Sequence, residues 1–180
     1  AGAQFQSGIR WTGGGSVTRL LIEGCLFEYF KSNIAMAPKA SAGPFKQIKV
    51  RGNVLWSAWS GDPSEYSQGI YANNLDGLLI EGNVIVRNGG LLGYTNDPDT
   101  KVPAGLTKKD VAVNWYNHQA YIQSGNTNVT VRNNIFASGD GVQLRPGGVA
   151  RDNLFYRTIV SLTVGSATTP VAGGVTASLI

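Results

Sequence analysis

The chain has 180 residues, a formal net charge of +4 and 24 glycines, and charged residues make up only 14% of it. A single cysteine and a single histidine exclude an internal disulfide and a zinc site of the usual Cys/His kind. No run of lysine and arginine indicates nucleic-acid binding, and no apolar stretch reaches the roughly 18 residues of a membrane helix. Many glycines with few charges favour β-structure, in a single domain.

Five short stretches align without gaps when they are taken in chain order. The common pattern is an alternation of apolar residues, a charged residue, a small or turn-forming residue, an asparagine or cysteine, and two apolar residues. It predicts one strand before the asparagine position and a second strand directly after it. The copies are LLIEGCLF (20–27), IKVRGNVL (48–55), LLIEGNVI (78–85), VTVRNNIF (129–136) and GVARDNLF (148–155).

A weaker series of short strands precedes these copies, so each repeat has two predicted strands. The tight copies recur about every 20 residues, which is typical of a parallel β-solenoid whose coils stack to build a shared core. The wider spacings predict loops at 57–69 and 88–119. The weaker series is IRWTGG (9–14), IAMAPK (34–39), IYANNL (70–75), YIQSGN (121–126) and VQLRPG (142–147), and we expect SLTVGS (161–166) to begin a sixth coil.

The asparagine position predicts a corner between the two strands of each repeat. We expect its side chains to stack in one column and to bond backbone groups that the bend leaves unpaired. The preceding position holds glycine, asparagine or aspartate, the residues that tolerate a left-handed bend. The column consists of Cys25, Asn53, Asn83, Asn134 and Asn153.

The charged position predicts a ladder on an outer face. Stacked in register, its residues alternate in sign over the first four coils, which favours a solvated ladder over a catalytic site. The residues are Glu23, Arg51, Glu81, Arg132 and Arg151.

Alternation in the weaker series divides its residues between the core and the outer face. The outer face is mostly small or apolar in the early coils. In the later coils a 22-residue offset places Tyr121 over Gln143 and Gln123 over Arg145. The residues predicted to point into the core are Trp11, Met36, Tyr71, Ile122, Leu144 and Leu162.

The four polar residues of the later coils predict a sugar-binding patch. The end of the long insertion brings Trp115, Tyr116 and His118 beside them. Aromatic rings pack on pyranose rings, amides bond hydroxyl groups, and arginine pairs with a carboxylate. Substrate-binding roles are therefore predicted for Gln123, Gln143, Tyr116 and Trp115. The alternative is a polar outer face with a loop lying over it.

Several segments resemble the right-handed parallel β-helix repeat of pectate-lyase-like proteins, namely IEGNVIVRNGG, VTVRNNIFASGDGVQLRPGG and ARDNLF. NHQAYIQSGN followed by GVQLRPGG is similar to bacterial β-helix proteins of undefined activity. The resemblance implies an all-β, right-handed parallel β-helix of about six coils. The coils would cover residues 9–164, with the insertion at 88–119 and an irregular tail at 165–180. The fold hosts lyases, hydrolases, epimerases and tailspikes, so it does not fix a function.

The lyase likeness implies that Arg145 is the base that removes the proton beside a uronate carboxylate. His118 or Tyr121 would then take or give a proton. The hydrolase likeness is weaker, because Asp140 has no adjacent acid and a hydrolase needs clustered carboxylates. We expect no cofactor. The loop acids Asp97, Asp99 and Asp110 could bind calcium, but their spacing matches no calcium loop.

The leading function predicted is therefore binding of an acidic polysaccharide, or its cleavage by β-elimination, by a secreted or cell-surface protein. No nucleic-acid or membrane partner is expected, and the oligomeric state is left open. The competing interpretation is a non-catalytic structural or adhesion module, such as part of a tailspike or a surface fibre. The early first coil and the tail SATTPVAGGVTASLI (166–180) favour a fragment of a longer β-helix or a minimal domain.

Overall fold

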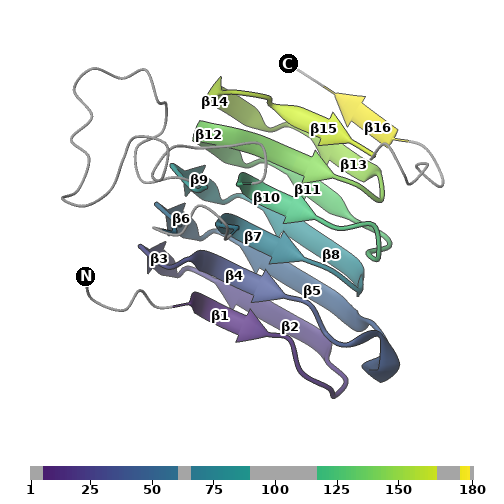
Figure 1. Cartoon of the computed structure of the whole chain (residues 1–180). Coiled ribbons are helices and arrows are strands. Elements are labelled where there is room, and N and C mark those ends of the chain that lie inside the picture. Colours follow the sequence, from purple (N-terminus) through teal and green to yellow (C-terminus); the bar gives the residue numbers. More distant parts are fainter. Residues whose placement is uncertain (1–5, 61–65, 90–116, 166–174, 179–180) are drawn as a thin grey trace.

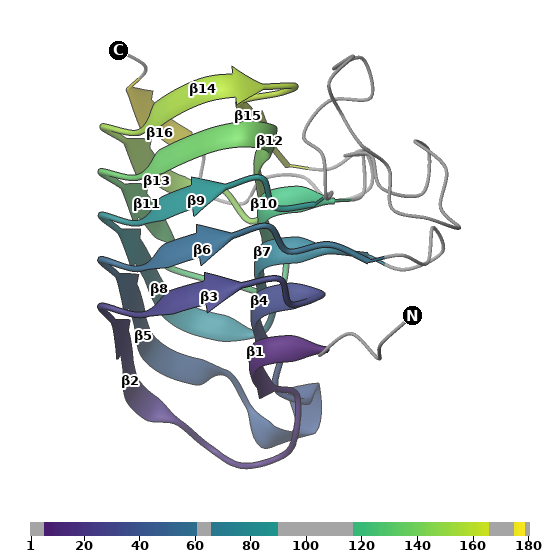
Figure 2. The same cartoon turned by 90° about the vertical axis from the view of Figure 1, so that its left-hand side faces the viewer.

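The computed structural model describes residues 6–60, 66–89, 117–165 and 175–178, and its strands pair in parallel. Successive strands lie in three different sheets, and the next strand of the chain returns to the first (Figures 1 and 2). Each strand therefore pairs with the strand that comes about three elements later in the chain, as β1 (Ser7–Trp11) pairs with β4 (Ser32–Met36) and β4 with β7 (Gln68–Ala72). This arrangement is compatible with a β-solenoid. Within the described ranges, no helix is long and apolar enough to cross a membrane.

The first sheet begins at the amino-terminal end of the chain and lies on the near side in Figure 1. Its central strands are five residues long. In spatial order its strands are β1 (Ser7–Trp11), β4 (Ser32–Met36), β7 (Gln68–Ala72), β10 (His118–Ile122), β12 (Ile135–Leu144) and β15 (Leu162–Val164).

The second sheet lies behind the first in Figure 1. Its strands are β2 (Thr18–Glu23), β5 (Phe45–Arg51), β8 (Leu75–Glu81), β11 (Thr130–Arg132), β13 (Gly148–Arg151) and β16 (Val175–Ser178). A short 3-10 helix, η1 (Ala40–Ala42), lies between β4 and β5. β16 lies within residues 165–180, for which the sequence indicated no regular element.

The third sheet faces the viewer in Figure 2. It consists of β3 (Leu26–Glu28), β6 (Val54–Trp56), β9 (Val84–Val86), the first part of β12, and β14 (Leu154–Thr158). β12 pairs with strands of both the first and the third sheets, because no loop interrupts it.

Two residues connect the second sheet to the third in every repeat. The first of them has a positive φ of 64° at Gly24, 61° at Gly52, 64° at Gly82, 55° at Asn133 and 56° at Asp152. The predicted left-handed bend is confirmed. Glycine adopts this conformation without strain, and asparagine and aspartate tolerate it better than other residues.

The second corner residue forms the predicted asparagine column. Asn83 donates its backbone N–H and its side-chain Nδ2 to Oδ1 of Asn134, both at 2.9 Å. Asn53 bonds Asn83 in the same way at 3.0 Å, and Asn134 bonds Asn153. Cys25 ends the column, with its backbone N–H donated to Asn53 Oδ1. The column is confirmed, and it satisfies buried backbone groups at each corner.

The core lies between the three sheets. Met36, Ile122 and Leu144 are fully buried, which confirms their predicted inward orientation. Leu162 is partly buried and packs against the core. Trp11 is 38% exposed, because β1 is the edge strand of the first sheet and has no neighbour on one side.

The predicted orientation of Tyr71 is wrong. It pairs with Tyr121 and lies on the outer face, whereas Ile70 pairs with Ala120 and is fully buried. Ala72 pairs with Ile122 and Asp76 pairs with Thr127, so the chain has one residue more between these paired positions after β10 than after β7. The sequence alignment without a gap therefore shifts β7 by one residue, and a shift of one residue exchanges the two faces of a strand.

The charged column is also confirmed. Glu23 pairs in register with Arg51, Arg51 with Glu81, and Glu81 with Arg132. The Nε of Arg132 lies 2.6 Å from Oε1 of Glu81, and Arg51 forms an ion pair with Glu23. Both pairs are partly exposed, so water and salt screen them.

The change Glu81→Arg should cost less than about 1 kcal/mol in the free energy of unfolding, since the pair of Glu81 with Arg132 is partly exposed. The loss should shrink at high salt, which screens the new repulsion. Urea denaturation at low and high salt measures both effects. A larger loss that salt leaves unchanged would show that Glu81 has a role other than the ladder.

Candidate functional site

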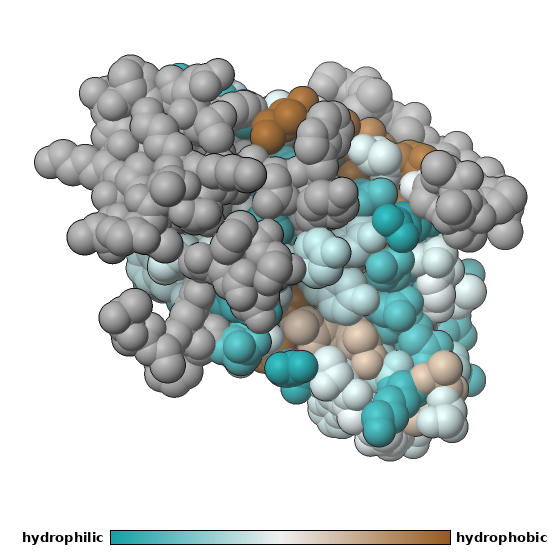
Figure 3. Space-filling view, in the orientation of Figure 1, coloured by the Kyte–Doolittle hydropathy of each residue, from teal (hydrophilic) through white to brown (hydrophobic). Residues whose placement is uncertain are grey.

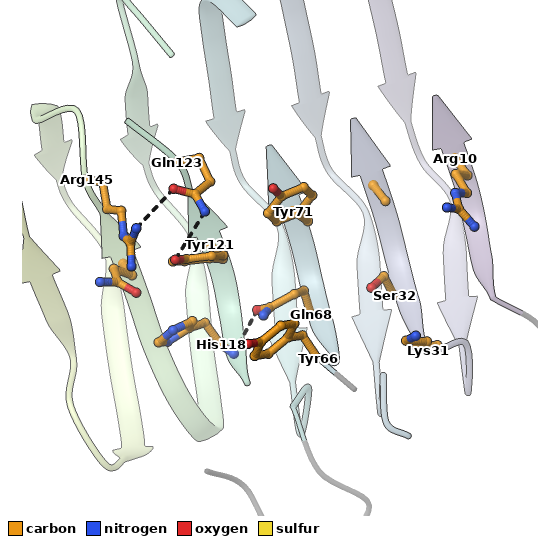
Figure 4. Close-up of a pocket in the computed structure, with 12 residues that line it drawn as sticks. Arg10, Lys31, Ser32, Tyr66, Gln68, Tyr71, His118, Tyr121, Gln123 and Arg145 are labelled. Atoms are coloured by element: carbon orange, nitrogen blue, oxygen red, sulfur yellow. Dashed lines mark hydrogen bonds between the residues drawn. The ribbon is translucent and has the colours of Figure 1, made fainter. Parts of the chain in front are cut away.

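A pocket of about 710 Å³ lies on the outer face of the first sheet. Hydrophilic side chains gather on this face of the molecule (Figure 3). The pocket extends across β1, β4, β7, β10 and β12, so each of these strands contributes one or more side chains (Figure 4). It is lined by Arg10, Lys31, Ser32, Ala35, Tyr66, Gln68, Tyr71, His118, Tyr121, Gln123, Gln143 and Arg145.

The structure brings together the four polar residues predicted from the later coils. Tyr121 pairs in register with Gln143, as expected from the 22-residue offset. Arg145 donates from Nη1 to Oε1 of Gln123 at 3.2 Å, and Gln123 donates from Nε2 to the Tyr121 hydroxyl at 3.3 Å. The guanidinium carbon of Arg145 lies 5.0 Å from the centre of the Tyr121 ring. Arg145, Gln123 and Tyr121 therefore form one connected network, and Gln143 lies on the strand beside Tyr121.

Arg145 still has hydrogen-bonding capacity to offer a ligand. Its Nε is buried and has no hydrogen-bond partner among the described residues. A buried donor without a partner is costly, whereas a carboxylate can take two parallel bonds from one guanidinium. The Nε itself is shielded, so an anionic group at this end of the pocket would be bound by the part of the guanidinium that lines it.

His118 is paired with Asp140 inside the same network. His118 Nδ1 lies 2.6 Å from Asp140 Oδ2, and 7% of His118 and 6% of Asp140 are exposed. The backbone N–H of Gly141 donates to Asp140 Oδ1 at 3.1 Å. The backbone N–H of His118 donates to Gln68 Oε1 at 2.8 Å. These contacts fix the imidazole and turn its Nε2 away from Asp140.

The histidine ring is stacked on Tyr121, with ring centres 4.9 Å apart. Strict alternation would place these two side chains on opposite faces, because they are three residues apart. The alternation breaks between them. Gln119 turns inward and donates from Nε2 to the Ala137 carbonyl at 2.8 Å.

Glycines in β12 provide the space for this break. A Cβ at Gly139 would lie 3.1 Å from Nε2 of Gln119, so a larger residue would displace that side chain. A Cβ at Gly141 would lie 2.1 Å from the Ser161 carbonyl oxygen. Small residues beside His118 and Asp140 therefore allow the chain to pass close to its neighbours.

Two further tyrosines lie near Tyr121. The rings of Tyr71 and Tyr121 are 5.9 Å apart, and Tyr66 lines the same pocket. Burial raises the pKa of the Tyr121 hydroxyl above its ordinary value, although the nearby Arg145 opposes the shift. The phenol therefore stays protonated at neutral pH and can donate a proton.

Other predicted residues are not placed. Trp115 and Tyr116 lie outside the described residues, as do the loop acids Asp97, Asp99 and Asp110. In the part of the chain that is described, no group of three or more His, Cys, Asp or Glu side chains could hold a metal ion.

Three features of the site are not among the sequence predictions: the pairing of His118 with Asp140, the outward Tyr71, and the basic residues of the early strands. The first has a visible signal, because His118 and Asp140 are separated by the same 22-residue offset as Tyr121 and Gln143.

No protein-family model, curated protein or solved structure matches this chain.

Proposed function

We propose that this pocket binds an acidic polysaccharide and cleaves it by β-elimination. The observation that carries the proposal is the network of Arg145, Gln123 and Tyr121 on an open pocket wall, beside the His118–Asp140 pair. It combines an anion clamp, an amide for hydroxyl groups, an aromatic face for a pyranose ring and a proton-transfer group. Such a polymer would be met by a secreted or cell-surface protein.

The roles of the residues follow from their chemistry. Arg145 is suited to clamp the uronate carboxylate, since a guanidinium does not lose its proton in proteins. His118 is better suited to be the base, because Asp140 holds Nδ1 and leaves Nε2 to accept a proton. We therefore propose His118 as the base, in place of Arg145, which the likeness to lyases implied.

The elimination would proceed in two coupled proton transfers. Nε2 of His118 removes the proton from the carbon beside the carboxylate. The electron pair of that C–H bond forms the C=C bond, and the glycosidic C–O bond breaks. The Tyr121 hydroxyl, which its raised pKa keeps protonated, donates its proton to the leaving oxygen as the C–O bond breaks. Arg145 offsets the negative charge that develops on the carboxylate.

A non-catalytic binding or structural module is the second candidate. The burial of His118 favours it, because only 7% of this residue is exposed and a base needs access to its substrate. The two candidates share the pocket and differ in whether an unsaturated product forms.

We further propose that the fold is a right-handed parallel β-helix of about six coils, similar to pectate-lyase-like proteins. Support comes from the three parallel sheets, the return of the chain to each sheet in turn, and the asparagine column at one corner.

The change Arg145→Gln should weaken the binding of an acidic oligosaccharide by about tenfold or more, because it removes the charged half of the clamp. Calorimetric titration measures the affinity, and the ultraviolet absorbance of unsaturated sugars measures cleavage. Arg151→Gln is the matched control, since Arg151 lies on the second sheet and pairs with Asp152. Equal affinity of the Arg145 variant and the wild type would contradict the clamp.

A further inference from the structure

The positive charges of the pocket lie at its two ends. Arg145 follows β12 at one end, whereas Arg10 lies in β1 and Lys31 just before β4 at the other (Figure 4). Between them, the described lining residues of β7 and β10 include no lysine or arginine. Tyr71 occupies this middle part. It pairs in register with Tyr121, over whose ring the guanidinium of Arg145 lies.

The middle of the pocket is unfavourable for an anion. The face of an aromatic ring carries negative charge, so a carboxylate over Tyr71 would be repelled. Over Tyr121 the guanidinium of Arg145 offsets this repulsion. His118 does not compensate, because the carboxyl group of Asp140 lies 2.6 Å from its Nδ1. A neutral pyranose ring, in contrast, packs well on tyrosine and bonds to amides such as Gln68 and Gln123.

The strand spacing gives the distance between the two charged ends. β1, β4, β7, β10 and β12 are neighbours in that order. Four spacings of about 4.8 Å separate Arg10 from Arg145 by about 19 Å along the direction in which the strands stack. One pyranose of a linear chain advances by nearly one strand spacing. A polymer lying across the strands would therefore place about one sugar on each strand.

From this placement we infer that the substrate is an acidic heteropolysaccharide with neutral sugars between its acidic ones. One acidic sugar lies at Arg145, whose guanidinium is over Tyr121, and the next at Arg10 and Lys31, with neutral sugars between them, one of which lies on Tyr71. A polyuronate, which carries a carboxylate on every residue, would place a charge over Tyr71. This inference rests on the proposed function and adds the spacing of charge along the polymer.

The test compares the binding of three polymers by the full chain. The first is deacylated gellan, a linear polymer with one glucuronate in each tetrasaccharide repeat. The others are polygalacturonate, with a carboxylate on every residue, and a neutral glucan. We expect fragments of gellan to bind at least about tenfold more tightly than galacturonate fragments of equal length, and the neutral glucan to bind least.

A variant tests the distant end of the pocket. Arg10→Gln should weaken binding of the gellan fragments by about tenfold when they span two glucuronates, and leave binding of fragments with one glucuronate unchanged. Lys49→Gln is the matched control, because Lys49 is exposed on the second sheet. Circular dichroism checks that both variants are folded.

The outcomes separate this inference from the proposed function. Binding of neither acidic polymer would overturn both. Binding of polygalacturonate as tightly as gellan, or an Arg10 variant that behaves as the wild type, would overturn the charge spacing and leave the proposed function standing. Preference for gellan together with a length-dependent loss in the Arg10 variant would support the inference.

Discussion

Replacing Asn83 with leucine should lower the free energy of unfolding by about 3 kcal/mol or more. Leucine has a similar size, but it cannot accept the bond from Asn53 N–H or donate to the Val50 carbonyl. Both groups are buried at the corner, and each buried polar group left without a partner costs about 1–3 kcal/mol. Chemical denaturation followed by circular dichroism measures the loss.

Asn153→Leu is the matched control for this prediction. Asn153 lies at the end of the described column and is only partly buried, so water can replace some of its bonds. Its loss should be clearly smaller than that of Asn83→Leu. If the two variants lose equal stability, or Asn83→Leu loses none, the column does not hold the corners in place.

The change His118→Gln should lower the rate of elimination by about 10²–10⁴, since general acid–base catalysis by a positioned side chain contributes this much. Substrate affinity should change little, because Arg145 and Tyr121 remain. The rate is measured from the unsaturated product and divided by the folded fraction of each preparation. That correction is needed because the variant leaves the buried Asp140 carboxylate without its imidazole partner.

Asp140→Asn separates catalysis from packing. Asparagine keeps the shape but favours the wrong imidazole tautomer, so the rate should fall while the fold persists. If Asp140 positions the imidazole of His118, the Asp140→Asn variant should also show a changed pH profile of the rate. An unchanged rate in both variants would assign His118 and Asp140 to structure. The absence of an unsaturated product from any acidic polymer, with binding intact, would favour the binding module.

The corners and the two ladders can be predicted from the sequence because they depend on short, gap-free copies. Asn53, Asn83 and Asn134 occupy the same place in each copy, and neighbouring coils repeat the same bonds. The local pattern and the long-range contacts therefore agree, which is the condition under which sequence reasoning is reliable.

The site is less predictable, because it depends on where the repeat is irregular. One extra residue after β10 shifts the gap-free alignment of β7, so Tyr71 is predicted to point inward although it lies on the outer face. The break in alternation around Gln119 places His118 and Tyr121 on the same face. Neither irregularity leaves a trace in an apolar pattern, since both arise from turn length and close packing against glycines.

The connection from the third sheet to the first is the corner whose length varies most among the described strands. The chain has no intervening residue within β12, three between β3 and β4, eleven between β6 and β7 and thirty-one between β9 and β10. The corner with the asparagine column always has two residues. Tyr66 and His118, which line the pocket, lie at the ends of the two longest connections. Evolution can therefore replace the connecting segments at this corner and so change the residues that line the pocket. The stacked strands of the core would stay the same, while the protein acquires new ligands.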